Sequence, residues 1–301
     1  MSGSLLLLFV FLSAFLAPPL SRLLRMPVPV GELVIGLLLG HFLAQGVALP
    51  EILGFLADFG FLLLMFLAGL EVDFNLRRHF VFYALYVVGM FLGAGLLAGL
   101  LGVGLAQALI LALVSIGLMV ATLRDMGILG RAFAKRVLIL GVLGEVASLF
   151  GLTAMEKAAH YQGLLSLLKE VGIIALFFLL LFLAFRLAGL FLWWYPVVGR
   201  SLVYEVDPSA MGIRLSLALM FAAAVMSGLV GLESVLGAFL AGMILSYFLQ
   251  KKHDLEAKLS AMGYGFLIPI FFIRTGMGID LSGLDGRLLL DGVLQPAPRG
   301  L

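Results

Sequence analysis

The sequence contains no cysteine, only four histidines and few charged residues. Without cysteine, neither a disulfide framework nor a thiolate metal site is available. Charged residues make up 12% of the 301 positions and the net charge is +2, so no concentrated basic segment is present for nucleic acid. No nucleophile and base occur in a catalytic pattern, so we expect neither an enzyme nor a bound cofactor. The histidines are scattered without metal-ligand spacing, at His41, His79, His160 and His253.

Apolar residues are abundant, at 63% of the chain with a mean hydropathy of +1.20. A soluble chain of this length could not bury so much apolar surface, whereas a protein that crosses the bilayer several times can. The composition therefore predicts an all-α polytopic membrane protein. Charges, prolines and turn residues delimit ten predicted helices, at residues 4–24, 28–43, 53–71, 79–101, 107–123, 137–155, 168–190, 213–230, 233–249 and 259–279.

Basic residues are concentrated in every second connection between these helices. The first, third, fifth, seventh and ninth connections contain Arg22, Arg25, Arg77, Arg78, Arg124, Arg131, Lys135, Arg136, Arg200, Arg214, Lys251, Lys252 and Lys258. The sixth contains Lys157 and Lys169, each beside a glutamate. This alternation predicts a multi-pass membrane protein with its N-terminus outside. We expect its location to be the bacterial inner membrane. The first helix has basic residues after it and none before it, which favours a transmembrane helix over a cleaved signal peptide.

Two stretches of the first half recur in the second half. Residues 30–40, VGELVIGLLLG, resemble residues 232–242, LESVLGAFLAG, and residues 60–73 resemble residues 265–280. Helices two and three thus recur as helices nine and ten, and the odd offset of seven helices inverts the second copy. Inverted-topology repeats are typical of alternating-access transporters. The alternative is a chance likeness between helices rich in Gly and Leu, and the conserved order and spacing of the two stretches favour the repeat.

The helix 137–155 contains one charged residue, Glu145. At about 1.5 Å per residue, Glu145 lies roughly 12 Å into the helix, near the midplane of a ~30 Å hydrocarbon core. A carboxylate there costs on the order of 2.5–3.5 kcal/mol on insertion scales, so it must face protein, water or a cation. We interpret Glu145 as a site for either a proton or a transported monovalent cation. The alternative is a structural acid that is paired with an arginine or protonated. Gly144 and Ser148 leave room beside it and add a hydroxyl.

The helix 107–123 holds Ser115 and Gly117 in apolar surroundings. A small polar centre is where a transporter helix can unwind and offer carbonyl groups to a cation. Periodicity alone favours a continuous helix in which Ser115 bonds to its own preceding turn. Arg274, in the last predicted helix, is either a buried counter-charge or a side chain that extends toward the interface, and both readings stay open.

Several other residues suggest structural roles. Glu32 and Glu233 lie near predicted helix starts, where a carboxylate complements the helix dipole. Pro269 predicts a kink in the last helix. Small residues allow close helix packing, which we expect on the fourth helix at Gly89, Gly93, Gly95 and Gly99.

Six stretches together resemble the monovalent cation:proton antiporter-2 family, which includes Kef-type potassium/proton and bacterial sodium/proton antiporters. They follow the family's order and cover most of residues 5–285. The stretches are PVPVGELVIGLLLG (27–40), FLLLMFLAGLEVDF (61–74), LALVSIGLMVATLRDMGIL (111–129), LGVLGEVASL (140–149), GLESVLGAFLAGMILS (231–246) and IPIFFIRTGMGIDL (268–281).

The resemblance implies a sodium/proton antiporter-like fold of thirteen helices, about ten of them present, that forms a homodimer in the lipid bilayer. Residues 1–167 would form the first inverted repeat, 168–212 a linker helix and interfacial loop, and 213–285 the start of the second repeat. The family's first broken helix maps onto 107–123, with its unwound centre at Val114 to Gly117, and its ion-binding acid maps onto Glu145.

The family usually has Asp at the ion-binding position, preceded by Asp, Asn or Gln, whereas this chain has Gly144 and Glu145. A single titratable group favours electroneutral exchange of Na⁺ or K⁺ for a proton. The tail 286–301 does not match the family, so we expect a C-terminally truncated chain. The alternative is therefore a non-transporting membrane protein or an assembly fragment. A sodium-coupled solute symporter would need a polar substrate pocket, for which the sequence shows no candidate cluster.

Overall fold

The helical class predicted from the sequence is confirmed in a computed structural model of the chain. The described residues are helices and short turns, and none of them forms a β-strand. The structure describes residues 3–42, 49–71, 80–102, 116–129, 131–134, 136–141, 143–144, 148, 172, 183, 186, 210–229, 233–248 and 253–279.

Most of the described helices follow the predicted segments closely. Six predicted segments agree with observed helices to within two residues at each end. The helices are α1 (Gly3–Leu23), α2 (Val28–Phe42), α3 (Glu51–Glu71), α4 (Phe80–Leu101), α6 (Ile116–Asp125), α10 (Met211–Leu229), α11 (Ser234–Phe248), α12 (His253–Met262), η2 (Gly263–Leu267) and α13 (Ile268–Met277). The predicted segments 107–123, 137–155 and 168–190 lie largely outside the described residues.

Five stretches are long and apolar enough to cross a membrane, and α2 and α11 are shorter apolar helices. The five are Gly3–Leu23, Glu51–Glu71, Val81–Leu101, Met211–Leu229 and Leu255–Met277. Many large apolar side chains on these helices are exposed, among them Phe15, Leu100 and Leu229. Exposed apolar surface of this extent is suited to contact with lipid. The chain is therefore an integral membrane protein.

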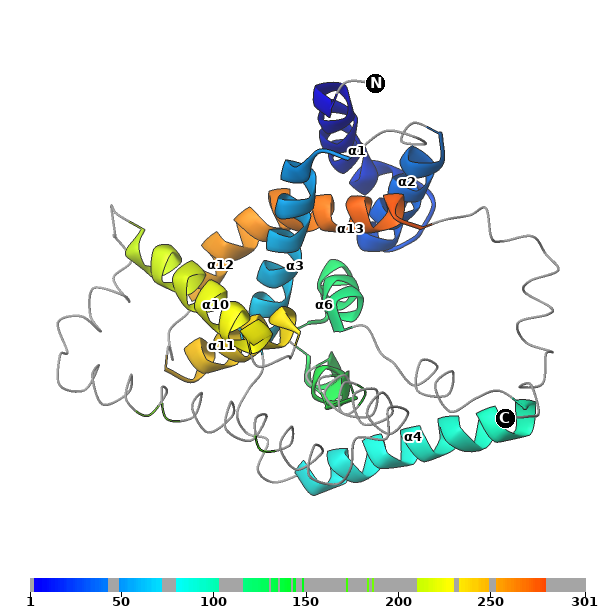
Figure 1. The fold of residues 1–301 in the computed structure, drawn as a ribbon, viewed down its shortest axis with the longest axis vertical. Coiled ribbons are helices and arrows are strands. Elements are labelled where there is room, and N and C mark those ends of the chain that lie inside the picture. Colours follow the sequence, from blue (N-terminus) through cyan, green and yellow to red (C-terminus); the bar gives the residue numbers. More distant parts are fainter. Residues whose placement is uncertain are drawn as a thin grey trace.

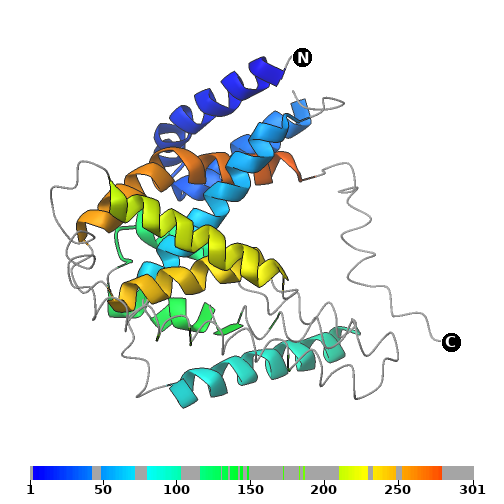
Figure 2. The ribbon, with the colours of Figure 1, turned by 60° about the vertical axis from the view of Figure 1, so that its left-hand side comes forward.

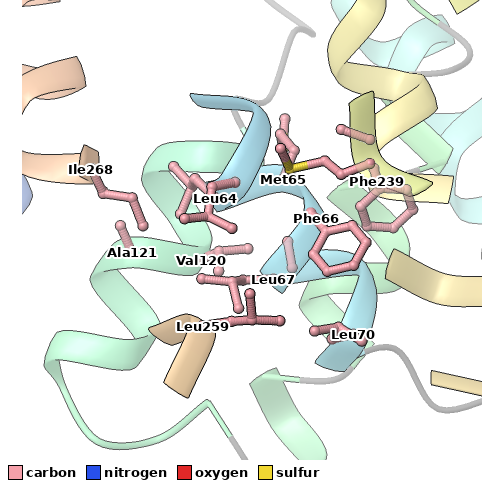
Figure 3. Close-up of a cluster of buried hydrophobic side chains, with 14 of the residues drawn as sticks. Leu64, Met65, Phe66, Leu67, Leu70, Val120, Ala121, Phe239, Leu259 and Ile268 are labelled. Carbon is pink, nitrogen blue, oxygen red and sulfur yellow. The ribbon is translucent and has the colours of Figure 1, made fainter. Parts of the chain in front are cut away.

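Helix α3 forms the centre of the described structure, and α6, α11, α13 and the η2 segment pack around it (Figures 1 and 2). Its C-terminal half is buried over consecutive positions rather than on one face, as expected for a helix with neighbours on several sides. Figure 3 shows side chains from four other helices meeting it. They are Val120 and Ala121 of α6, Phe239 of α11, Leu259 of α12 and Ile268 of α13.

Several pairs of described elements touch backbone to backbone at a glycine, among them α2–α13 and α3–α11. In the pair α2–α13, a Cβ built on Gly276 would meet the backbone of Leu33 and Leu37. In the pair α3–α11, a Cβ built on Gly69 would meet the backbone of Phe239 and Met243. Any side chain larger than hydrogen would force either pair apart, so glycine fixes both interhelical distances.

The two pairs share one contact register. Gly36 of α2 lies against Ile273, and Gly242 of α11 lies against Phe66. The two glycines, Gly36 and Gly242, are 206 residues apart in the sequence. The two residues that they contact, Ile273 and Phe66, are 207 residues apart, so the two contacts occupy equivalent places in the two halves. The sequence alignment of residues 30–40 with 232–242 instead pairs Gly40 with Gly242, one helical turn away. Hydropathy alone could not fix this register.

Helices α2 and α13 run in the same direction, because Gly36 meets Ile273 and Gly40 meets Met277. The predicted topology requires this, since both are even-numbered helices.

The glycines of α4 behave differently from the expectation. A Cβ on Gly89, Gly93, Gly95 or Gly99 would meet no described atom within 4 Å, so they mark no close contact within the described part of the chain.

The last predicted helix is longer and less regular than expected. It begins at His253, six residues before the predicted start, because the polar stretch 253–258 is helical without being apolar. The expected disturbance at Pro269 is a π-helical segment, Gly263–Leu267, directly before it. Proline cannot donate to the carbonyl four residues earlier, and a π-helical turn adjusts the hydrogen-bond ladder at that place.

Candidate functional site

Helix α6 is the described part of the predicted broken helix, and it packs on α3. A Cβ built on Gly117 would lie 3.3 Å from side-chain atoms of Phe61 and Leu64. Phe61 in turn stacks on Phe271 of α13, with ring centroids 4.5 Å apart. The start of α6 is thus held by side chains of α3. Val114, Ser115 and Glu145 lie outside the described residues, so the structure does not test their predicted roles.

Two neighbours of Glu145 in the sequence are described. Ser148 is fully buried and donates a hydrogen bond of 2.8 Å from its hydroxyl to the carbonyl oxygen of Gly144. A Cβ built on Gly144 would lie 3.5 Å from Cε of Met90 on α4. The hydroxyl hydrogen of Ser148 is therefore used within its own helix, and both oxygen lone pairs stay available to another group.

Arg274 lies in the last turn of α13 and is partly buried. One of its terminal guanidinium nitrogens would lie 3.4 Å from a Cβ built on Gly278, so the side chain extends toward the C-terminal end of its helix. A cation at that end complements the partial negative charge of the last carbonyl groups. This placement agrees with the reading in which Arg274 extends toward an interface.

The C-terminal end of α6 carries polar contacts that link three elements. The guanidinium carbon of Arg124 lies 4.2 Å from the ring centroid of Tyr264, in the η2 segment. Asp125 Oδ2 accepts a hydrogen bond of 3.0 Å from the backbone N–H of Val28. That N–H belongs to the first turn of α2, where it has no partner within its own helix. Asp125 therefore caps α2 from a position 97 residues away in the sequence.

Glu32 lies one turn beyond this cap and is 4% exposed. The sequence interpretation placed it at a helix start, but α2 begins at Val28 and has no acid in its first turn. Asp125, which accepts the N–H of Val28, lies about one helical turn from Glu32. Glu233, in contrast, directly precedes α11 and is exposed, as expected.

Sequence reasoning missed Asp125 and Tyr264 as members of this polar cluster. Asp125 lies in the basic fifth connection, beside Arg124, where the sequence predicts a solvated carboxylate. Tyr264 reads as part of an apolar run. Only the packing of α6 between α2 and η2 brings Asp125 to Val28 and Arg124 to Tyr264. The described residues contain no group of three or more His, Asp or Glu that could hold a resident metal ion.

Comparison with known proteins decides the family. The family described as "Sodium/hydrogen exchanger, transmembrane" matches residues 11–293. The chain belongs to this family. The resemblance drawn from the sequence motifs is thereby confirmed, and the described core of this exchanger domain comprises the helices around α3.

Individual relatives agree with the family assignment. The chain is 28% identical to YjbQ of Bacillus subtilis over 309 residues, which covers 91% of this chain and 47% of YjbQ. It is 28% identical to a Na⁺/H⁺ antiporter of Enterococcus hirae, covering 94% of this chain and 75% of that protein. It is also 28% identical to the glutathione-regulated potassium-efflux system protein KefC of Escherichia coli, covering 90% and 44%. The exchanger domain thus spans about half the length of YjbQ and KefC.

Proposed function

We propose that this chain exchanges a monovalent cation, Na⁺ or K⁺, for a proton across the membrane through a single carboxylate, Glu145. The family match over residues 11–293 is the observation that carries the proposal. The relatives are named as a Na⁺/H⁺ antiporter and as a potassium-efflux protein, which supports cation and proton as substrates. An acid near the middle of an apolar helix adds a residue that can bind both ions.

The mechanism follows from competition at one site. Glu145 holds a proton when it is desolvated, and an arriving cation displaces that proton. Ser115 and carbonyl groups between Val114 and Gly117 would assist cation binding, and Gly144 leaves space beside the carboxylate. Ser148 and Arg274 are accessory candidates. Only the protonated or cation-bound site is neutral enough to cross the dry barrier, so one cation exchanges for one proton.

The proposed architecture has two inverted repeats and an N-terminus outside the membrane. The shared contact register of the pairs α2–α13 and α3–α11 supports the repeats, because each pair combines one helix from each copy. The common direction of α2 and α13 supports an even number of crossings between them. We propose a homodimer in the lipid bilayer on the basis of the family resemblance.

Reconstitution into liposomes that contain a pH-sensitive dye tests this function. The wild-type chain should move protons when Na⁺ or K⁺ is added, and Glu145→Gln should abolish that movement. Glu51→Gln, which changes an exposed acid at the start of α3, is the matched control and should transport normally. Exchange that persists in Glu145→Gln would overturn the proposed site, and a wild-type chain that moves no protons would favour the non-transporting alternative. Insensitivity of the wild-type rate to an imposed membrane potential would support electroneutral exchange.

A further inference from the structure

Glu32 is a buried carboxylate that the proposed exchange mechanism does not use. It is 4% exposed, and no hydrogen bond or ion pair joins it to any residue that the structure describes. A buried carboxylate without such partners is destabilised in its ionised form, because burial removes hydration and no hydrogen bond or opposite charge replaces it. A group in this position is suited to binding a proton.

A second polar group nearby also lacks a partner. Ser21 of α1 is 1% exposed, its hydroxyl makes no hydrogen bond, and it lies against Gly31, the residue before Glu32. Ser21 thus presents an unused polar atom at the α1–α2 contact, beside the turn that carries Glu32. Unpaired polar atoms are rare in protein interiors and suggest a site that exchanges protons or water.

The charged groups around Glu32 come from the helices that pack on α2. These are Arg22 on α1, Arg124 and Asp125 on α6, and Arg274 on α13. Arg274 extends toward Gly278, away from the α13 end that is level with Glu32, and Arg124 lies over Tyr264. Asp125 is the one that a hydrogen bond holds about one helical turn from Glu32, through the N–H of Val28.

Asp125 also holds α6 to α2. Its carboxylate accepts the N–H of Val28, about 6 Å along the helix axis from Glu32. A negative charge on Glu32 would repel the carboxylate of Asp125 and weaken this hydrogen bond. A neutral Glu32 would leave the bond intact. The protonation of one buried acid can thus change the contact between two helices.

We propose that Glu32 is a second proton-binding carboxylate, distinct from Glu145, and that its ionisation releases the Asp125 cap and separates the end of α6 from α2. Protons reach Glu32 from the solvent-exposed end of the contact, where Asp125 is exposed. Lowering the pH neutralises Glu32 and holds α6 against α2, whereas raising the pH releases α6. The consequence for exchange rests on the proposed function, since α6 belongs to the proposed broken helix.

Spin labels at Leu24 and Met126 test the separation directly. Both side chains are exposed, at the α1–α2 turn and just after Asp125, and the chain has no cysteine that would compete for the label. In the full-length Leu24→Cys/Met126→Cys protein, the distance between labels should lengthen as the pH rises. Glu32→Gln and Asp125→Asn, which each remove the repulsion, should abolish this change, and Glu51→Gln should retain it. A wild-type distance that is independent of pH, or an unchanged response in Glu32→Gln, would overturn the proposal.

Exchange measurements separate this proposal from the proposed function. Glu145→Gln should lose exchange but keep the pH-dependent change in label distance. Glu32→Gln should exchange cations with a flattened pH profile at the alkaline side, because α6 stays held. If the wild-type chain transports nothing, the proposed function fails, and the label distances still decide the role of Glu32. If Glu32→Gln keeps the wild-type pH profile and the wild-type distances, the role of Glu32 fails alone.

Discussion

Ser148 shows how a single side chain can serve structure beside a proposed ion site. Its hydroxyl donates to Gly144, four residues earlier, and Ser216 makes the same bond to Gly212 on α10 at 2.7 Å. The two serines have the same internal bond in different surroundings. A comparison of the two therefore separates helix stabilisation from ion binding.

We expect Ser148→Ala and Ser216→Ala to lower stability by similar amounts, about 0.5–1.5 kcal/mol each, through loss of one hydrogen bond. Ser216→Ala should leave the apparent cation affinity unchanged, whereas Ser148→Ala should weaken it, because the Ser148 oxygen keeps its lone pairs for an ion. Thermal unfolding in detergent and the cation dependence of exchange measure the two effects. An equal cation affinity in the two variants would remove Ser148 from the candidate ion site.

Arg124 packs its guanidinium group over the face of the Tyr264 ring. Cation–π contacts are worth about 0.5–2 kcal/mol, depending on desolvation. We expect Arg124→Gln to lower the thermal stability measurably, and Arg214→Gln, at an exposed position on α10, to leave it unchanged. Equal melting temperatures for the two variants in detergent would show that the Tyr264 contact has no energetic weight.

At the scale of the helices, some glycines lie against the backbone of a neighbouring helix, and others have no described neighbour. A Cβ on Gly69 would lie 2.8 Å from the backbone nitrogen of Met243, and one on Gly276 would lie 2.9 Å from that of Leu37. A Cβ on Gly93 would meet no described atom within 4 Å. The same substitution therefore has opposite effects at different glycines.

Gly69→Ala and Gly276→Ala should each destabilise the protein by about 1–3 kcal/mol, because backbone atoms must move apart. Gly93→Ala should be neutral or should stabilise α4 by about 0.5–1 kcal/mol, because alanine favours the helix. Thermal unfolding of the three purified variants checks the order. A destabilising Gly93→Ala would mean that α4 has a close neighbour in the protein.

The positions of the helices could be predicted from the sequence because membrane thickness sets the length of an apolar segment. The pairing of helices could not. The glycines of α4 have the spacing expected of a close helix contact, but the close contacts in the described structure are made by others, including Gly36 and Gly276. A glycine allows a close approach but does not specify which helix approaches it. Burial of Glu32 depends on helices distant in the sequence, so hydropathy around it assigned it to a helix start.

At the scale of the whole molecule, the predicted orientation can be tested with the cysteine-free chain. Leu24 and Glu51 are both exposed and lie in the first and second connections. With the N-terminus outside, an impermeant maleimide added to intact cells should label Glu51→Cys and spare Leu24→Cys. Permeabilised cells provide the control, in which both variants should react. Labelling of Leu24→Cys in intact cells would reverse the topology.

The glycine contacts also indicate which surfaces can slide. Helices that meet backbone to backbone, as α2 meets α13 and α3 meets α11, cannot shift along one another without first moving apart. Helix α6 meets α3 through the ends of Phe61 and Leu64, which can change rotamer at little cost. Each glycine-paired unit would therefore travel as a rigid body. A displacement of α6 against α3 would therefore meet less resistance than one within either glycine-paired unit.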